Sequence, residues 1–285
     1  MTSRILLFAL LALCGFSAPA AQHGKMSKQV EASMVVTGEL MVAPDGKVES
    51  YQIDRADTLP PETREMLAKA IPNWELEVAK ADGSPLQSPA AVKMSVQLVA
   101  RPIADDDENL RVTIQDTAFW DPKAEFDAKA KGKLAPPKYP PFAARAGMSG
   151  MVYVVVLLNS DGNVAETHVE RVDMTVLADE KTLRKFSKVL AESAVAASKE
   201  WSFTIAPGRF AKGPVAVRVP IDFRLAAGNR EYGQWQAYVP GLYAPIPWEN
   251  RTADGDVEHG IGAMVPGQIY STDAPIKLRN SQAGS

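Results

Sequence analysis

The sequence has few of the residues on which catalysis and nucleic-acid binding depend. Cys14 is its single cysteine, so a chain that has lost its N-terminal segment has neither a disulfide nor a thiolate nucleophile. The three histidines, at positions 23, 168 and 259, lack metalloprotease spacing, and no Gly-x-Ser-x-Gly motif occurs. The formal net charge of −3 gives no reason to expect a nucleic-acid partner. We therefore expect no catalytic residue, no metal and no cofactor.

Long hydrophobic runs are also missing. The longest one, Ile5–Phe16, has 12 residues, against about 20 for a membrane-spanning helix. Small residues follow at Ala18 and Ala20, which is typical of a secretory signal peptide over residues 1–20 that is cleaved after Ala20. A retained anchor and a lipidated Cys14 stay open as alternatives, and only these two would attach the chain to a membrane. The signal peptide predicts a periplasmic or secreted protein.

What the sequence does contain is one pattern that occurs twice. In the second half, apolar residues alternate over 150–158, the turn Asp161-Gly162 follows, and a second strand-like segment leaves it. In the first half, Leu40 and Val42 alternate into the turn Asp45-Gly46, and residues 48–53 leave it. We interpret both Asp-Gly pairs as hairpin turns, because Gly46 and Gly162 can adopt the positive φ that such turns need.

The segments after the two hairpins match as well. Each hairpin is followed by a helix-like segment that ends near a tryptophan, Trp74 or Trp201, which we expect in the core. Another alternating strand then follows, over 90–101 in the first half and 213–225 in the second. In the second strand Pro220 has no N–H to donate, which favours an edge or bulged position. Both halves therefore show the same order of predicted elements: a hairpin, a helix and a further strand.

Composition divides the rest of the chain. The predicted boundaries are a signal peptide over 1–20, a first domain over 30–101, a partly flexible linker over 102–135, a second domain over 136–226 and an irregular tail over 227–285. The linker contains the acidic run Asp105–Glu108 and one short strand-like segment, 110–115.

The tail is rich in Gly, Pro and aromatic residues and shows no sustained period. Its aromatic side chains either dock on the second domain or anchor a partner or a carbohydrate. It also contains four potential metal ligands within six residues, Asp254, Asp256, Glu258 and His259, which we interpret as a solvated loop because they lack the spacing of a calcium loop.

Single residues across 136–225 form a recognisable set: Tyr139-Pro140, Ala143, Gly147, Gly150, Asp161-Gly162, Trp201, Gly213-Pro214, Pro220 and Phe223. As a set they resemble the TonB C-terminal domain family. Residues 33–101 resemble the same domain more loosely and lack the Tyr-Pro pair. We interpret the chain as two tandem copies, of which the first is degenerate.

The resemblance implies an α+β fold of two small domains, each a helix packed on a short antiparallel sheet. It also implies a binding function. In energy transducers this domain binds a short segment of an outer-membrane receptor by strand addition, in which an exposed sheet edge pairs with the incoming backbone. We expect the same here, with an outer-membrane receptor or another envelope protein segment as the partner. The expected site consists of the edge strand and its lead-in: Val215, Val217, Val219 and Ile221, with Tyr139 and Pro140.

Two transducer features are absent from this sequence. The family's membrane-embedded His has no counterpart in Ile5–Phe16, and only 11 residues, 22–32, stand where the family has a long Pro-rich spacer. We therefore expect a non-catalytic interaction module of the Gram-negative envelope that is related to TonB-dependent transport. The alternatives are a membrane-anchored TonB energy transducer, and a carbohydrate-binding or hydrolytic envelope protein that uses the tail.

Overall fold

The computed structural model describes residues 30–78, 86–103, 106–120, 128–225, 232–248, 260–272 and 276–279. The predicted signal peptide, Cys14 and the acidic segment 254–259 lie outside these residues. Of the helices in the described ranges, none combines the length and the apolar character that crossing a membrane requires.

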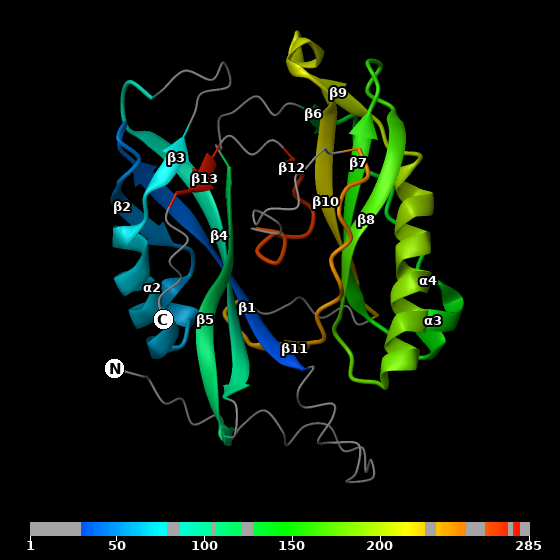
Figure 1. The fold of residues 1–285 in the computed structure, drawn as a ribbon, viewed down its shortest axis with the longest axis horizontal. Coiled ribbons are helices and arrows are strands. Elements are labelled where there is room, and N and C mark those ends of the chain that lie inside the picture. Colours follow the sequence, from blue (N-terminus) through cyan, green and yellow to red (C-terminus); the bar gives the residue numbers. More distant parts are fainter. Residues whose placement is uncertain are drawn as a thin grey trace.

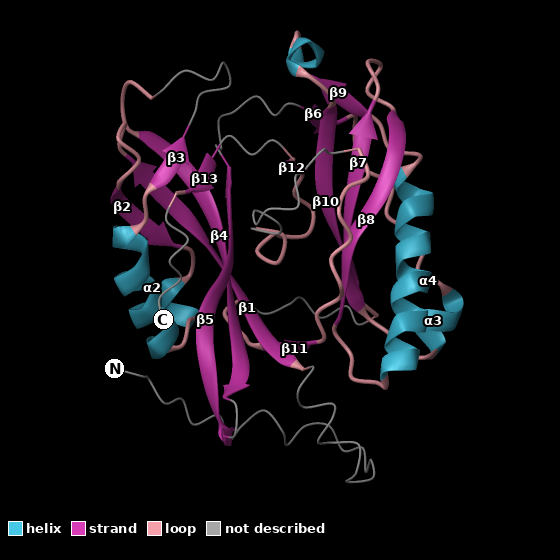
Figure 2. Cartoon of the chain, viewed as in Figure 1, coloured by secondary structure: helices cyan, strands magenta, loops and turns pink. Residues whose placement is uncertain are grey.

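Two halves, each a sheet with a helix on its outer face, lie side by side (Figures 1 and 2). The first half contains β1 (Glu31–Val42), β2 (Val48–Ile53), η1 (Ala56–Thr58), α2 (Pro61–Ala70), η2 (Ile71–Asn73), β3 (Leu76–Val78), β4 (Ala90–Ile103) and β5 (Asp106–Trp120). The second half contains β6 (Ala128–Ala130), α3 (Pro141–Arg145), β7 (Gly150–Leu158), β8 (Val164–Met174), α4 (Glu180–Ser198), β9 (Phe203–Ile205), η3 (Arg209–Lys212) and β10 (Val215–Phe223).

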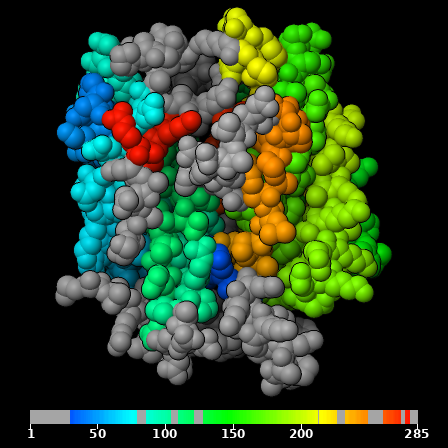
Figure 3. Space-filling view, viewed as in Figure 1, coloured from blue at the N-terminus to red at the C-terminus, as the bar shows by residue number. Residues whose placement is uncertain are grey.

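The residues after the second half form three short strands that return to both halves. They are β11 (Gln236–Tyr238), β12 (Tyr270–Ser271) and β13 (Ile276–Leu278). We call the described residues 232–248, 260–272 and 276–279 the C-terminal segment. In the space-filling view its orange part lies against the second half and its red end against the first (Figure 3).

The two sheets share one order of elements. In each half a hairpin is followed by a helix, a short strand and a long strand that pairs with the first strand of the hairpin. The first sheet has the order β11-β1-β4-β5, with β2 also paired to β1, and the second has the order β12-β10-β7-β8. The mixed helix and antiparallel sheet predicted from the sequence is confirmed as the fold class.

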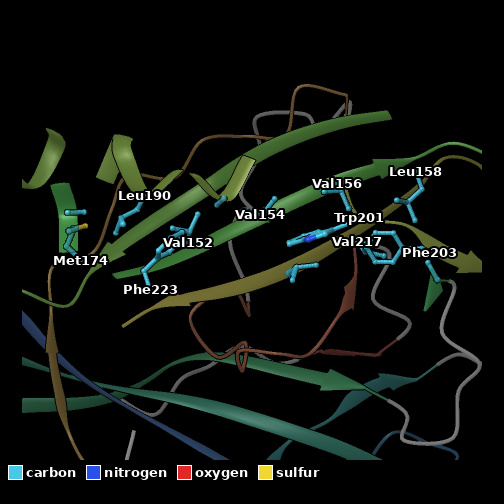
Figure 4. Close-up of a cluster of buried hydrophobic side chains, with 14 of the residues drawn as sticks. Val152, Val154, Val156, Leu158, Met174, Leu190, Trp201, Phe203, Val217 and Phe223 are labelled. Atoms are coloured by element: carbon cyan, nitrogen blue, oxygen red, sulfur yellow. The ribbon is translucent and has the colours of Figure 1, made fainter. Parts of the chain in front are cut away.

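The outer face of the second sheet forms the core of that half (Figure 4). Alternate residues of β7, such as Val152, Val154 and Val156, are fully buried because period two places them on one face. The helix supplies the matching stripe at helical spacing, which is Leu183, Phe186, Leu190 and Ala194. The helix starts at an N-cap, Asp179, whose carboxylate accepts the N–H of Thr182 at 3.0 Å.

Both hairpin turns approach the strand after the helix closely. Gly46 has φ +92°, and a Cβ there would lie 2.1 Å from the carbonyl oxygen of Leu76. Gly162 has φ +80°, and a Cβ there would lie 1.9 Å from that of Phe203. The glycines therefore serve close approach as well as positive φ. Trp74 and Trp201 precede these two strands, and both are buried.

The predicted linker needs a correction. Most of its first part is β5, a strand of 15 residues that pairs with β4 from Lys93↔Trp120 to Ile103↔Asp106. Only residues 110–115 gave a strand signal in the sequence, because polar residues such as Asp116 and Thr117 interrupt the apolar alternation. The first half consequently extends to Trp120, and β6 pairs with β9 of the second half.

Candidate partner-binding site

The predicted lead-in lies at one end of β10. The Tyr139 hydroxyl donates a hydrogen bond to the Met148 carbonyl, and its ring meets Phe223 edge to face with the centroids 5.6 Å apart. Pro140 is the N-cap residue of α3. Burial raises the pKa of Tyr139, which keeps this anchoring hydroxyl neutral. The structure thus places Tyr139 and Pro140 where they fix the chain entering the domain.

The side chains of β10 divide between the two faces of the sheet. Val215, Val217 and Val219 are buried in the core beneath α4, and Ile221 packs against the same cluster. These four predicted residues therefore share one stripe on the face of the sheet that α4 covers. What β10 can offer a partner is its backbone edge and its opposite face.

One backbone edge of β10 is fully used within the domain. It pairs with β7 along its whole length, from Val215↔Leu158 to Phe223↔Gly150. The other edge pairs with β12 at Val217↔Ser271 and Arg218↔Tyr270. This edge of the predicted site is therefore occupied around these two residues, where the chain's own C-terminal segment supplies a strand.

The hydrogen-bond pattern shows which groups of β10 face β12. The Ala216 carbonyl accepts the Thr272 N–H at 3.2 Å and the Thr272 hydroxyl at 3.3 Å. Because backbone groups alternate between edges with period two, Pro220 presents its nitrogen to the same edge as Ala216. A proline in this position costs no bond to β7, which gives Pro220 the edge role that its sequence indicated.

The opposite edge of the sheet, on β8, also carries the C-terminal segment. Met174 and Val239 exchange both backbone hydrogen bonds, at 3.0 and 2.8 Å, and the Ala244 N–H reaches the Glu170 carbonyl at 2.7 Å. Between them Gly241 approaches so closely that a Cβ would lie 2.1 Å from the Val172 carbonyl oxygen. Sequence reasoning missed this contact, and the glycine between Pro240 and Leu242 was its one available signal.

The inner face of the same sheet carries buried charges. The Arg218 guanidinium donates to both carboxylate oxygens of Glu170, at 2.7 and 3.0 Å, and Glu170 is completely buried. Next to this pair, Arg171 lies 3.1 Å from the Asp173 carboxylate. Burial raises the pKa of Asp173, and the charge of Arg171 opposes that shift. The inner face thus combines buried charges with apolar side chains such as Met151 and Val155, whereas the outer face is apolar.

Residues 260–272, which we call the plug, fill the space between the two sheets. Ile261, Ala263 and Met264 are buried in one cluster with side chains of β5 and β7. Tyr270 meets Trp120 of β5 edge to face with the ring centroids 5.8 Å apart. Burial raises the pKa of Tyr270 to about 12, so its hydroxyl is neutral at physiological pH.

A buried carboxylate holds the start of the plug. Asp116 of β5 accepts the backbone N–H of Gly260 at 3.3 Å and that of Gly262 at 2.9 Å. A Cβ on Gly262 would lie 1.9 Å from Oε1 of Gln97 and 2.7 Å from Oδ2 of Asp116. A side chain at position 262 would therefore have to displace Gln97 and Asp116, so glycine favours the deep position of the plug.

The aromatic residues of the C-terminal segment dock on both halves. The Tyr238 hydroxyl donates to Glu31 at 2.7 Å, and Trp235 packs on the core of the first half. Trp248 meets the ring of His168 of the second half edge to face at 6.2 Å. Of the two interpretations of these aromatics, the structure favours docking on the chain itself, although on both halves and not only on the second.

With this geometry in place, the relatives of the chain are informative. Residues 135–225 match the family model described as Gram-negative bacterial TonB protein C-terminal. This part of the chain is similar to the TonB C-terminal domain. It contains α3, β7, β8, α4, β9, η3 and β10, whereas β6 and the C-terminal segment lie outside the matched residues.

Two relatives named Protein TonB, from two strains of Xanthomonas campestris pv. campestris, are each 34% identical over 102 residues. The match covers 36% of this chain and 40% of each relative, so the chain spans less than half the length of these curated relatives. No solved structure gives a significant match. The first half lies outside the family match, and its origin as a second copy stays a prediction.

Proposed function

We propose that this chain is a non-catalytic interaction protein of the Gram-negative envelope, related to TonB-dependent transport. Its TonB C-terminal domain binds an extended segment of another envelope protein, an outer-membrane receptor in the first instance, by strand addition to β10. The supporting observation is that this edge already accepts a strand, because β12 pairs with Val217 and Arg218. Backbone pairing makes modest demands on the partner's sequence.

The same proposal places the protein in the periplasm or outside the cell after removal of residues 1–20. It also treats the first half as a degenerate second copy of the domain. The shared element order supports this, as do the turn glycines, since the Gly46 carbonyl accepts the Leu76 N–H at 2.8 Å and the Gly162 carbonyl accepts the Phe203 N–H at 2.7 Å.

The experiment uses a fluorophore just beyond the C-terminal end of β10. Because Cys14 is the only native cysteine, Leu225→Cys gives a single labelling site in a chain that lacks residues 1–20, and Leu225 is 43% exposed. The matched control is Ser50→Cys on β2, which is exposed in the first half. The probes are synthetic peptides that copy the periplasm-facing N-terminal segments of outer-membrane receptors from the same genome.

The proposal predicts a saturable fluorescence change at position 225 and none at position 50. A response at position 50 alone would move the site to the first half. No binding of any peptide at concentrations up to about 1 mM, which corresponds to a binding free energy of only about −4 kcal/mol, would remove the proposal.

A membrane-anchored energy transducer is the second candidate, favoured by the relatives named Protein TonB. It requires a retained N-terminus. N-terminal sequencing and membrane partition after expression in a Gram-negative host separate the two: a soluble chain that begins at Ala21 supports the periplasmic module. A membrane-bound chain that begins at Met1 supports the transducer, and one that begins at Cys14 indicates a lipoprotein.

A further inference from the structure

We propose that the plug, residues 260–272, occupies the partner-binding surface within the same chain and has to leave before a partner segment binds. The surface consists of the β10 edge at Ala216–Arg218 and the space between β5 and β7. The partner that fits it is an extended peptide segment with an aromatic side chain in the place of Tyr270. This inference rests on the proposed function, since it names what regulates that site.

The first argument is that plug and partner need the same backbone groups. The plug pairs with β10 at Val217 and Arg218, and Thr272 adds two hydrogen bonds to the Ala216 carbonyl. A strand added to this edge by another protein would need these same groups. The two occupants therefore exclude each other, and the plug is a competitor of the partner.

The second argument is that β12 is a short strand. It contributes two residues, whereas β10 has nine, and β7 pairs with all nine of them. Sheet stability grows with the number of paired residues, so a partner strand longer than two residues would gain pairs that the plug does not make. An edge held by so short a strand is suited to exchange.

The third argument is the chemistry of the surface beneath the C-terminal segment. The contact between the outer face of the second sheet and α4 is apolar. The inner face has apolar contacts with the plug as well, through Met151 and Tyr153, but it also holds the Glu170–Arg218 pair, and the facing strand holds Asp116 under the plug. A buried ion pair often stabilises a fold less than apolar residues of similar volume. Charged side chains suit a surface that is solvated during part of the protein's working cycle.

Tethering sets how strongly the plug competes. A segment of the same chain competes for its site at an effective concentration on the order of 1 mM. A partner that binds the vacant surface with micromolar affinity would therefore bind the closed chain more weakly by one to three orders of magnitude. Loosening the plug should recover a measurable part of this factor.

The test uses the full chain without residues 1–20 and the variant Gly262→Val, whose side chain would clash with Gln97 and Asp116. The probe is a fluorescein-labelled peptide with the sequence of residues 260–272, followed by fluorescence anisotropy. We expect it to bind Gly262→Val at least about 10-fold more tightly than the wild type. The matched control, Gln268→Ala, changes an exposed residue of the same segment and should bind like the wild type.

A second peptide, in which the residue equivalent to Tyr270 is Ala, should lose most of the gain. Tyr270→Ala in the full chain provides an independent way to loosen the plug and should also bind the unmodified peptide more tightly than the wild type. If both variants fold but bind the peptide no better than the wild type, the proposal is wrong. If both fail to fold, the plug is a permanent part of the core and the proposal is equally wrong.

The failure of this inference can be distinguished from failure of the proposed function. Receptor-segment peptides that bind the wild type and Gly262→Val equally would keep the binding function and remove the plug as its competitor. The plug peptide binding to Gly262→Val while every receptor peptide fails would keep the displaceable plug and remove receptor segments as partners.

Discussion

The two halves of this protein complete their first strands in different ways. In the second half β8 has 11 residues and pairs with the whole of β7, from Leu158 to Gly150. In the first half β2 has six residues and pairs with β1 only from Gly38 to Val42. The uncovered start of β1, Glu31–Ser33, pairs instead with β11 of the C-terminal segment.

This difference separates two roles within the C-terminal segment. Where the first hairpin is short, β11 completes the sheet. Tyr238 stabilises this pairing by donating a hydrogen bond to Glu31. Where the second sheet is already complete, the plug lies on an edge and a face that the domain could present to another molecule. We therefore expect β11 to be structural and the plug to be exchangeable.

The largest expected effect compares the two hairpin turns. Gly46→Ala and Gly162→Ala each place a methyl group about 2 Å from a backbone oxygen, so each should lower the free energy of unfolding by about 3 kcal/mol or more. Gly132→Ala is the matched control, because Gly132 has φ +84° with open space around it and should lose only about 1 kcal/mol. Urea unfolding gives all three values. A Gly46→Ala variant as stable as Gly132→Ala would show that the two hairpin turns are not equivalent.

The next effect concerns the inner face of the second sheet. Arg218→Leu leaves Glu170 buried without its bidentate partner and should cost about 3 kcal/mol, measured by urea unfolding. The double variant Glu170→Leu/Arg218→Leu should cost less than this single change, because no buried charge is left. If the double variant is the less stable of the two, the Glu170–Arg218 ion pair stabilises the fold more than two leucines would. The buried charges would then no longer distinguish the inner face of the sheet from its outer face.

A smaller effect appears at high pH. The pKa of Tyr270 is raised by burial to about 12, above the value of about 10 in an unfolded chain. The buried, neutral Tyr270 hydroxyl contributes about 2 kcal/mol to the free energy of unfolding. This contribution is fully present below pH 10 and is lost as the pH rises towards 12. Chemical denaturation of wild type and Tyr270→Phe over this range measures it, and the variant should show the shallower decline. Equal slopes would mean that the plug does not bury this hydroxyl.

The smallest effect distinguishes the two main helices. Asp179 caps α4 through the Thr182 N–H, whereas α2 begins after Pro60, which makes no side-chain cap. Asp179→Ala should lower the melting temperature by about 2 °C, and Asp179→Asn should keep most of the cap. Hydrogen bonding to Thr182 lowers the pKa of Asp179, so the advantage of Asp over Ala should disappear as the pH falls below about 4. Calorimetry at pH 7 and pH 3 checks both points.

The comparison also explains what the sequence could reveal. Both hairpins and the helix before Trp201 carry regular periods over many residues, so their positions follow from alternation and from turn chemistry. The strands β11, β12 and β13 have two or three residues each, too few for any period to appear. Their partners lie far away in the chain, as in the pairing of Glu31 with Tyr238. Long-range pairing of this kind leaves no local trace.

The candidate site was predictable in part for the same reason. The apolar stripe of β10 and the edge role of Pro220 can be derived from the strand alone. Occupation of that edge by Tyr270 and Ser271 depends on a segment about 50 residues further along the chain, and only the fold brings the two together.

The measurement that tests the central claim most directly is hydrogen exchange during titration of a receptor-segment peptide into the wild-type chain. Exchange is followed at the amides of residues 260–272 and of β10. The account predicts that the bound peptide accelerates exchange throughout the plug while the amides of Val215–Phe223 stay protected. A peptide that binds and leaves exchange in the plug unchanged would contradict it.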